Sequence, residues 1–257
     1  MSGQGLTAEG GERYAELQLV TNFSFLNGGS HADELIERAK ALGLDAIAIA
    51  DRNTLAGVVR AHTAAEEAGV QLIVGARLDL EDAPSLLCFP KDRAAYGRLS
   101  RLLSLGQGRS AKGECELCLA DVAAAAEGQV FVALAPETWC WREVLDEEGQ
   151  KERPRTTTEF AAEVIAFPSR RLSKREMVAP AGERAFPCDG EKGARAESLE
   201  AELGRVRAAL GAGTLYLAVS HLYRGDDRTR IEALSRIADR VGIAIVATND
   251  VLYHGPE

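Results

Sequence analysis

Three stretches of the sequence combine the end of a predicted strand with side chains able to bind a metal or move a proton. They are VTNFSFLNGGS (residues 20–30), ADRNTLAG (residues 50–57) and ATNDVLYHGPE (residues 247–257). Asp51 ends the second predicted strand, and Asp250 and His254 follow the last one. Carboxylates and imidazoles are common ligands of catalytic divalent cations, but one aspartate with one histidine is a weak metal signal. These side chains could form a metal centre or could be turn and capping residues. For Asp51 the second interpretation is favoured.

The other polar candidates are more weakly placed. The first predicted strand ends in QLVTN (residues 18–22), which offers no strong metal ligand or general base. We expect Ser30 to be the N-cap of the first helix. His31 is then expected at the start of that helix on the surface, and His62 at a helix edge. His221 follows a predicted strand and is the best placed histidine, but its nearest carboxylates, Asp226 and Asp227, are expected to cap the next helix.

The five cysteines indicate free thiols, because their number is odd and they are scattered through a chain expected in the cytoplasm. Cys115 and Cys118 have the spacing of half a zinc site or of a redox pair, but no second pair of cysteines exists. The run GECELCLADV around them is predicted to be a short strand entering a helix, and their spacing is interpreted as coincidence. We find no glycine-rich phosphate loop and no nucleophile elbow. The cysteines are Cys88, Cys115, Cys118, Cys140 and Cys188.

The elements that must position these side chains alternate between apolar strands and helices. Continuous apolar strands separated by helices are typical of parallel α/β sheets and barrels, whose functional groups lie at the C-terminal ends of the strands. Six or seven such units favour a closed barrel. The predicted strands cover about residues 14–20, 46–50, 70–80, 85–89, 128–135, 214–220 and 243–250, and the predicted helices about 30–42, 54–68, 91–105, 198–210 and 227–241.

Composition limits the classes of function. The 257 residues are 46% hydrophobic and 27% charged, with a formal net charge of −9. No apolar run approaches the roughly 20 residues of a membrane span. An acidic chain lacks the electrostatic footprint of a nucleic-acid binder, so we do not expect DNA binding by this chain alone.

Two segments interrupt the alternating pattern. Residues 1–13 have no apolar core and are predicted to be a flexible leader. Residues 137–197 are charged and punctuated by proline and glycine, which predicts a long and partly disordered insertion. Its basic cluster could contact nucleic acid, although a solvated loop is the more common outcome for such a run. The cluster consists of Arg170, Arg171, Lys174 and Arg175.

The run YAELQLVTNFSFLNGGSHADELIERAKALGLDAIAIADRNTLAGVVRAH resembles the start of the polymerase-and-histidinol-phosphatase (PHP) domain of bacterial C-family DNA polymerases, which include the DNA polymerase III alpha subunit. The similarity is greatest to their error-prone paralogues. It continues through VGARLDL, YGRLSRLLSLGQGRSAKGECEL and VFVALAP, and resumes from LYLAVSHLYRGDD to the end of the sequence. The resemblance implies an α/β fold, a distorted (β/α)7 barrel over residues 14–257 with the insertion at about 137–197.

The resemblance also implies where a metal cluster would be bound. Histidines and carboxylates at the barrel mouth hold the metals of hydrolytic PHP domains, which activate water for phosphoester cleavage. Here an early histidine position falls on Glu16, and arginines stand at two ligand positions, where a fixed cation repels a metal. The resemblance therefore implies a degenerate site with no bound metal and no catalytic residue. Its aligned positions are Gln18, Val20, Asp51, Arg52, Arg77, Asp250 and Leu252.

The resulting interpretation is a structural PHP domain, or a fragment, of an error-prone DNA polymerase. The resemblance implies palm and thumb domains in cis, contact with DNA and Mg²⁺ only through the full-length enzyme, and a cytoplasmic role in translesion synthesis and DNA repair. Mutagenesis accessory proteins and the sliding clamp are candidate partners. The alternatives are a stand-alone metal-dependent phosphoesterase or 3′–5′ exonuclease, and a truncated gene product without function.

Overall fold

A computed structural model describes residues 14–136, 139, 192–211 and 213–254. The predicted leader lies outside these residues, as does nearly all of the predicted insertion, including its basic cluster. The elements are β1 (Ala15–Leu19), α1 (Ala32–Ala41), β2 (Ala46–Arg52), α2 (Val58–Ala68), β3 (Gln71–Leu78), β4 (Leu86–Pro90), α3 (Arg93–Arg109), α4 (Leu119–Ala124), β5 (Gln129–Ala133), α6 (Lys192–Leu210), β6 (Leu215–Ser220), α7 (Asp227–Val241) and β7 (Ala244–Thr248).

The described strands form one seven-stranded sheet in sequence order, from β1 to β7. Neighbouring strands are parallel except that β4 runs antiparallel to both β3 and β5. Residues 79–85 are too few to carry a crossover, which needs a dozen or more residues, so the chain turns back after β3. The expectation of parallel strands therefore fails at β4.

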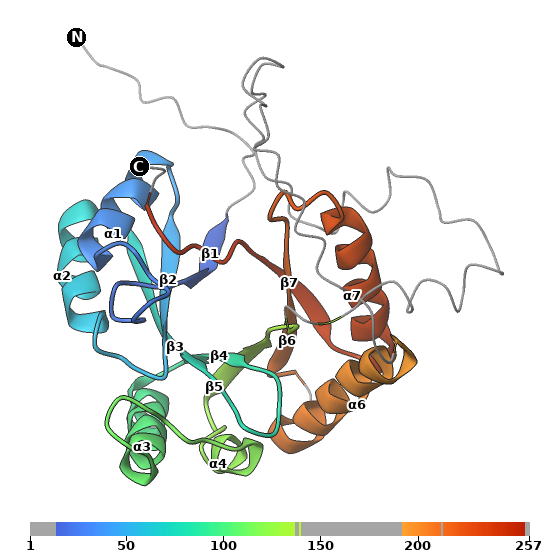
Figure 1. Ribbon diagram of the computed structural model, residues 1–257. Helices are drawn as coiled ribbons and strands as arrows, with labels where there is room; N and C mark the ends of the chain where they lie inside the picture. The colour runs from blue at the N-terminus through green and yellow to red at the C-terminus, as the bar shows by residue number, and fades with distance from the viewer. Residues whose placement is uncertain (1–13, 137–138, 140–191, 212, 255–257) are drawn as a thin grey trace.

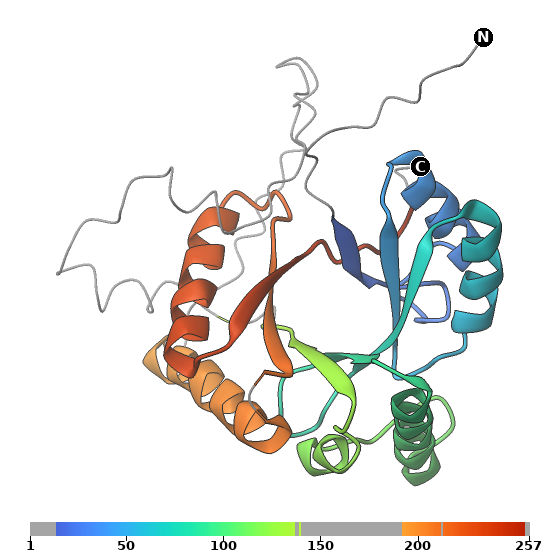
Figure 2. The ribbon, with the colours of Figure 1, turned by 180° about the vertical axis from the view of Figure 1, so that it is seen from behind.

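The residues after β7 bring the two edges of the sheet together. Leu19 forms a parallel bridge with Val251. The Val251 amide donates to the Gln18 carbonyl at 2.8 Å, and the Val20 amide donates to the Val251 carbonyl at 3.1 Å. The result is the predicted seven-stranded barrel, nearly closed, with the strands around a common axis and the helices outside (Figures 1 and 2).

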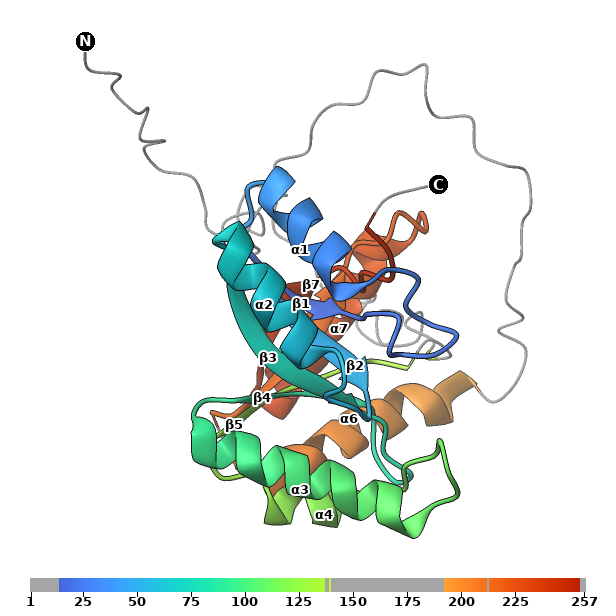
Figure 3. The same ribbon diagram turned by 90° about the vertical axis from the view of Figure 1, so that its left-hand side faces the viewer.

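Three apolar clusters account for the layers of the molecule. One lies inside the barrel, because its members come from the strands and the residue after β5; they include Ala48, Ala50, Phe89 and Ala218. A second packs α1 and α2 against the outer faces of β1 and β2. The third and largest packs α3, α4, α6 and α7 against the other strands. Figure 3 shows α1 beside α2, and α3 beside α4.

Most helices match the predicted ranges, but several starts differ. Ser30 is not the N-cap of α1: His31 occupies that position, and its amide donates to the Glu34 carboxylate at 2.7 Å. Ser30 is instead used in the contact with His254 described below. Helix α6 begins at residue 192, inside the predicted insertion. The short strand expected before α4 is absent from residues 114–118, and Cys118 is the N-cap of that helix.

No described helix is both long enough and apolar enough to cross a membrane.

Candidate functional site

A cavity of about 600 Å³ lies at the mouth of the barrel, where the C-terminal ends of β1, β2, β3 and β6 meet the segment after β7. This is the end at which parallel α/β barrels carry their functional groups. Six of the seven positions selected from the sequence line it, and Asp51 does not. The six are Gln18, Val20, Arg52, Arg77, Asp250 and Leu252.

Strand alternation brings Arg52 and Arg77 to the mouth. Side chains two residues apart share a face of a strand, and Ala48 and Ala50 belong to the interior cluster, so Arg52 follows them on the same face. Ile73 of β3 packs against the same cluster, and Arg77 lies four residues later on the same face of its strand. The two arginines are also register partners in the β2–β3 ladder. They therefore lie side by side at the end of the barrel interior.

A shared carboxylate, that of Asp79, holds the two arginines. Arg52 donates from Nε to Asp79 Oδ2 at 2.6 Å, and Arg77 donates from Nε to Asp79 Oδ1 at 2.8 Å. The Ser85 hydroxyl donates to Asp79 Oδ1 at 2.7 Å, and the Asp79 amide donates to the Asn53 side chain at 3.0 Å. Burial alone would raise the pKa of Asp79, but the Arg77 charge and the hydrogen bonds from Ser85, Arg52 and Arg77 outweigh burial and lower it. Asp79 is therefore an ionised anchor for both guanidinium groups.

Asp51 lies one residue before Arg52 and faces the other way, toward the loop between β1 and α1. Its carboxylate accepts from the Thr21 amide at 2.7 Å, the Thr21 hydroxyl at 2.8 Å and the Ser24 hydroxyl at 2.7 Å. Only 1% of the residue is exposed. Gly57 packs so closely that an added Cβ would lie 2.7 Å from Asp51 Oδ2. Asp51 neither caps a helix nor reaches the cavity; it fixes the loop to the end of β2.

Gln18 and Asp250 are joined at the mouth. The Gln18 amide nitrogen donates to Asp250 Oδ1 at 2.7 Å, and the Thr248 hydroxyl donates to Gln18 Oε1 at 2.9 Å. The side chain of Gln18 thus connects β1 to β7 and to the segment that closes the barrel. Val20 is buried, and Leu252 is 37% exposed; neither side chain has a donor atom for a metal.

Glu16 is a buried carboxyl group that shares the β1–β7 seam. It accepts from the Tyr14 hydroxyl at 2.7 Å, the Gln18 amide at 2.8 Å and the Asn249 amide at 3.2 Å. Burial raises the pKa of Glu16 in spite of these three hydrogen bonds, and burial also raises the pKa of Tyr14. The sequence pointed to Glu16 only through the family resemblance and did not point to Tyr14 or Asn249.

The four histidines do not converge on one site. His254 Nδ1 lies 2.8 Å from the Ser30 hydroxyl, which also accepts from the His254 amide at 2.9 Å. His62 pairs with Glu66 on the exposed side of α2, as expected for a helix edge. His31 is exposed at the start of α1, also as expected, and His221 packs edge-on against Tyr223 with ring centroids 4.8 Å apart.

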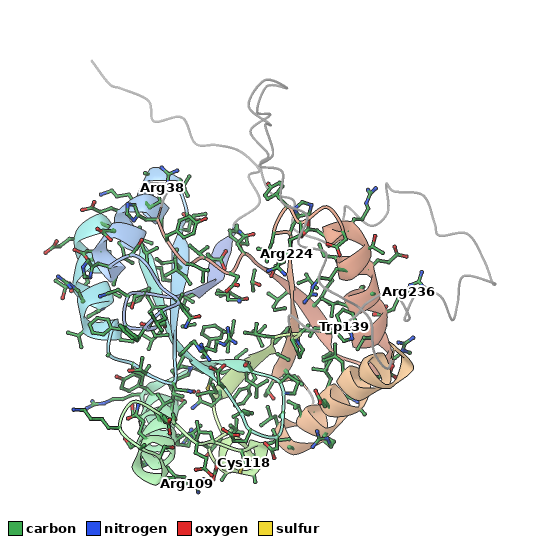
Figure 4. All side chains as sticks on the ribbon, in the orientation of Figure 1. Arg38, Arg109, Cys118, Trp139, Arg224 and Arg236 are labelled. Atoms are coloured by element: carbon green, nitrogen blue, oxygen red, sulfur yellow. The ribbon has the colours of Figure 1, made fainter. Side chains whose placement is uncertain are left out.

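The described cysteines are free thiols. Burial raises the pKa of Cys88 inside the sheet and that of Cys115 near α3. The Cys118 thiol donates to Asp121 at 3.1 Å, and Arg109 makes two hydrogen bonds to the same carboxylate. Figure 4 places Arg109 and Cys118 far from Arg224 at the mouth. Cys140 and Cys188 lie outside the described residues.

The residues at the mouth do not fit a metal cluster. Across the described ranges, no three His, Cys, Asp or Glu side chains are grouped closely enough to hold an ion. The carboxylate of Asp51 is occupied by three donors and lies outside the cavity. Asp250 accepts from Gln18, and the guanidinium groups of Arg52 and Arg77 line the same cavity as Asp250. We therefore derive no chemistry through a metal.

The cavity also contains cations that the sequence did not single out. Arg224, in the loop before α7, and Arg230, in the first half of α7, line the wall opposite Arg52 and Arg77. The Arg230 guanidinium lies 5.7 Å from the ring centre of Trp139. Single arginines in a loop and a helix carry no motif, so only the fold could bring them together.

Comparison with known proteins gives two kinds of match. The PHP domain family model matches residues 16–138. Over 95% of its length the chain is 42% identical to error-prone DNA polymerases of Caulobacter vibrioides and Rhodopseudomonas palustris, covering 17% and 21% of those proteins. The chain therefore matches the PHP-domain region of error-prone DNA polymerases. The chain thus spans about a fifth of the length of these curated relatives.

A solved structure supports the fold of this PHP domain. A proposed metal-dependent phosphoesterase from Bifidobacterium adolescentis superposes with a TM-score of 0.54 over 95% of this chain and 88% of that one. The two sequences are 19% identical, so the similarity concerns the architecture of the PHP barrel and not its activity.

Proposed function

We propose that this PHP domain is a non-hydrolytic structural module of an error-prone DNA polymerase. The observation that carries the proposal is the lining of the barrel mouth: Arg52 and Arg77 line the cavity at positions where the resemblance implies metal ligands, and Asp51 is a hydrogen-bond anchor outside it. Nucleotidyl transfer on primed DNA is then the work of a palm outside this chain, where the resemblance implies Mg²⁺. We further propose a role in translesion synthesis and repair in the cytoplasm, with palm and thumb domains as partners in cis.

The first test is hydrolysis by the purified chain. We expect no release of phosphate from a phosphomonoester, and no shortening of a 3′-labelled primer, with Mg²⁺, Mn²⁺ or Zn²⁺ above the rate measured with a chelator. Asp250→Asn is the matched variant, because it keeps the acceptor for Gln18 and removes a charged ligand. Metal-dependent hydrolysis that this substitution abolishes would establish the alternative, a stand-alone phosphoesterase or exonuclease.

The second test is the size of the native product, measured by immunoblot of DNA-damaged cells with an antibody against this domain. A band far above the 27.5 kDa of the chain supports the polymerase module. A band at that mass contradicts the polymerase proposal for this chain.

A further inference from the structure

The cavity at the barrel mouth is lined mainly by cationic rather than anionic side chains. Among its described lining residues are four arginines, Arg52, Arg77, Arg224 and Arg230, against two aspartates, Asp227 and Asp250. Ser85, Ser220 and Gln18 add neutral polar groups to the same lining. A concave surface focuses the field of like charges within it, so this balance favours an anionic ligand.

The two aspartates are both engaged by the protein. Asp227 is 3% exposed, and its carboxylate accepts from the amides of Leu222 at 2.8 Å, Arg224 at 2.7 Å and Gly225 at 3.3 Å. Asp250 accepts from the side-chain nitrogen of Gln18 at 2.7 Å. Both carboxylates therefore hold the loops that shape the cavity, which reduces their repulsion of an incoming anion.

Arg52 and Arg77 keep positive charge in spite of their shared partner. One ionised carboxylate, Asp79, faces two guanidinium groups, so the three side chains together carry a net charge of about +1. Each guanidinium has five N–H donors, and the contacts with Asp79 and Ser85 use only some of them. Asp79 is in turn held by Ser85 and Asn53, so the two arginines are positioned before any ligand arrives.

The second pair of arginines comes from the other side of the barrel. Figure 1 shows β2 and β3 on one side of the barrel axis and β6 with α7 on the other. Arg230 is fixed beside Trp139 and donates to the Pro136 carbonyl at 3.5 Å. Arg224 belongs to an exposed loop, which Figure 4 shows before α7. Together the two pairs present guanidinium groups from opposite walls of one cavity.

We propose that the barrel mouth binds a phosphate-type oxyanion directly through these arginines, without a metal ion. Guanidinium forks match the geometry of phosphate oxygens and bind them by pairs of charge-assisted hydrogen bonds. A cavity of about 600 Å³ admits a pyrophosphate or the phosphates of a short single strand of DNA. The inference rests on the proposed function in one respect, namely that the mouth holds no metal.

The test is calorimetric titration of the 257-residue chain at low salt with a chelator present, using inorganic pyrophosphate and, separately, a single-stranded pentathymidylate. We expect saturable binding that weakens as salt is added, because exposed ionic contacts are screened. Binding of pyrophosphate alone indicates a small free anion. Binding of the oligonucleotide, with displacement by pyrophosphate, indicates nucleic-acid phosphates. If neither pyrophosphate nor the oligonucleotide binds, the inference is wrong.

The variants assign the binding to the cavity. We expect Arg77→Ala and Arg224→Glu each to weaken binding at least about tenfold, because each removes guanidinium contacts with the anion. Arg224 is exposed in a loop, so its variant should remain folded if Arg77→Ala does not. Arg109→Ala is the matched control, because Arg109 is paired with Asp121 far from the mouth, and its affinity should change less than about twofold.

Two results separate this inference from the proposed function. If the parent chain and both mouth variants bind the anion with equal affinity, the anion binds elsewhere. That result overturns the oxyanion site but leaves the proposed function standing. Binding that appears only when a divalent metal replaces the chelator overturns both, since the mouth would then be a metal centre.

Discussion

Replacement of Asp51 by alanine is expected to destabilise the domain strongly. The substitution removes the acceptor of three short hydrogen bonds and leaves the Thr21 amide and the Thr21 and Ser24 hydroxyls without that partner in a buried site. A hydrogen bond to a charged group is worth about 1.5–3 kcal/mol, and bonds to one carboxylate are not additive. We expect a loss of about 3–4 kcal/mol, a large part of the roughly 5–15 kcal/mol that stabilises a typical domain.

The assay is urea unfolding of the 257-residue chain followed by circular dichroism. Asp51→Asn preserves the shape and one acceptor oxygen, so it should lose only about 1–2 kcal/mol. Asp250→Ala is the control, because the partly exposed carboxylate of Asp250 accepts from the side chain of Gln18 at the barrel mouth, and this variant should lose about 1 kcal/mol. If Asp51 instead served only to bind a metal, its charge would be uncompensated in the metal-free protein, and its removal would not lower the stability. An unchanged or increased stability of Asp51→Ala would therefore refute the anchoring role.

Two further substitutions test the seam and the interior of the barrel, and a third, on α3, is their control. Burial raises the pKa of Glu16 above its ordinary 4.5, so the folded state holds a proton that the unfolded state releases, and stability falls as pH rises above about 4.5. Glu16→Gln should remove this part of the loss, and urea midpoints with the same pH dependence in both proteins would contradict it. Gly75→Ala should cost about 1–3 kcal/mol, because the new Cβ would lie 2.5 Å from the Phe89 ring. Gly97→Ala, in open space on α3, should instead stabilise by about 1 kcal/mol in the same denaturation assay.

The barrel was predictable because its signal is local. Apolar strands of about five residues alternate with helical patterns, and each glycine stop, such as Gly69 after α2, can be read within a few residues. The direction of β4 was not read in this way, since it depends on the brevity of residues 79–85 rather than on the strand's own composition. Ser30 was assigned as a cap for a similar reason: its true partner, His254, is 224 residues away in the sequence.

The candidate site was predictable in position but not in chemistry. The sequence placed Arg52 and Arg77 at the mouth by resemblance, but their shared counter-ion, Asp79, reads as an ordinary turn residue in LDLEDAP. Asp51 appeared to be a mouth residue because it ends a strand; strand alternation directs it instead toward Thr21, 30 residues earlier. Such contacts depend on which face of a strand meets which loop, and composition carries no signal for that.

The seam between β1 and the residues after β7 has a consequence for the order of folding. Gln18 and Asp250 are 232 residues apart in the sequence, and the backbone bonds of Val251 are what join the two edges of the sheet. Contacts of such long sequence separation form slowly, because the entropy of closing the intervening loop must be lost first. During synthesis one edge of β1 therefore has no hydrogen-bond partner until residue 251 has left the ribosome. Barrel closure is expected to be the last and slowest structural step, after α1 and α2 have packed on β1 and β2.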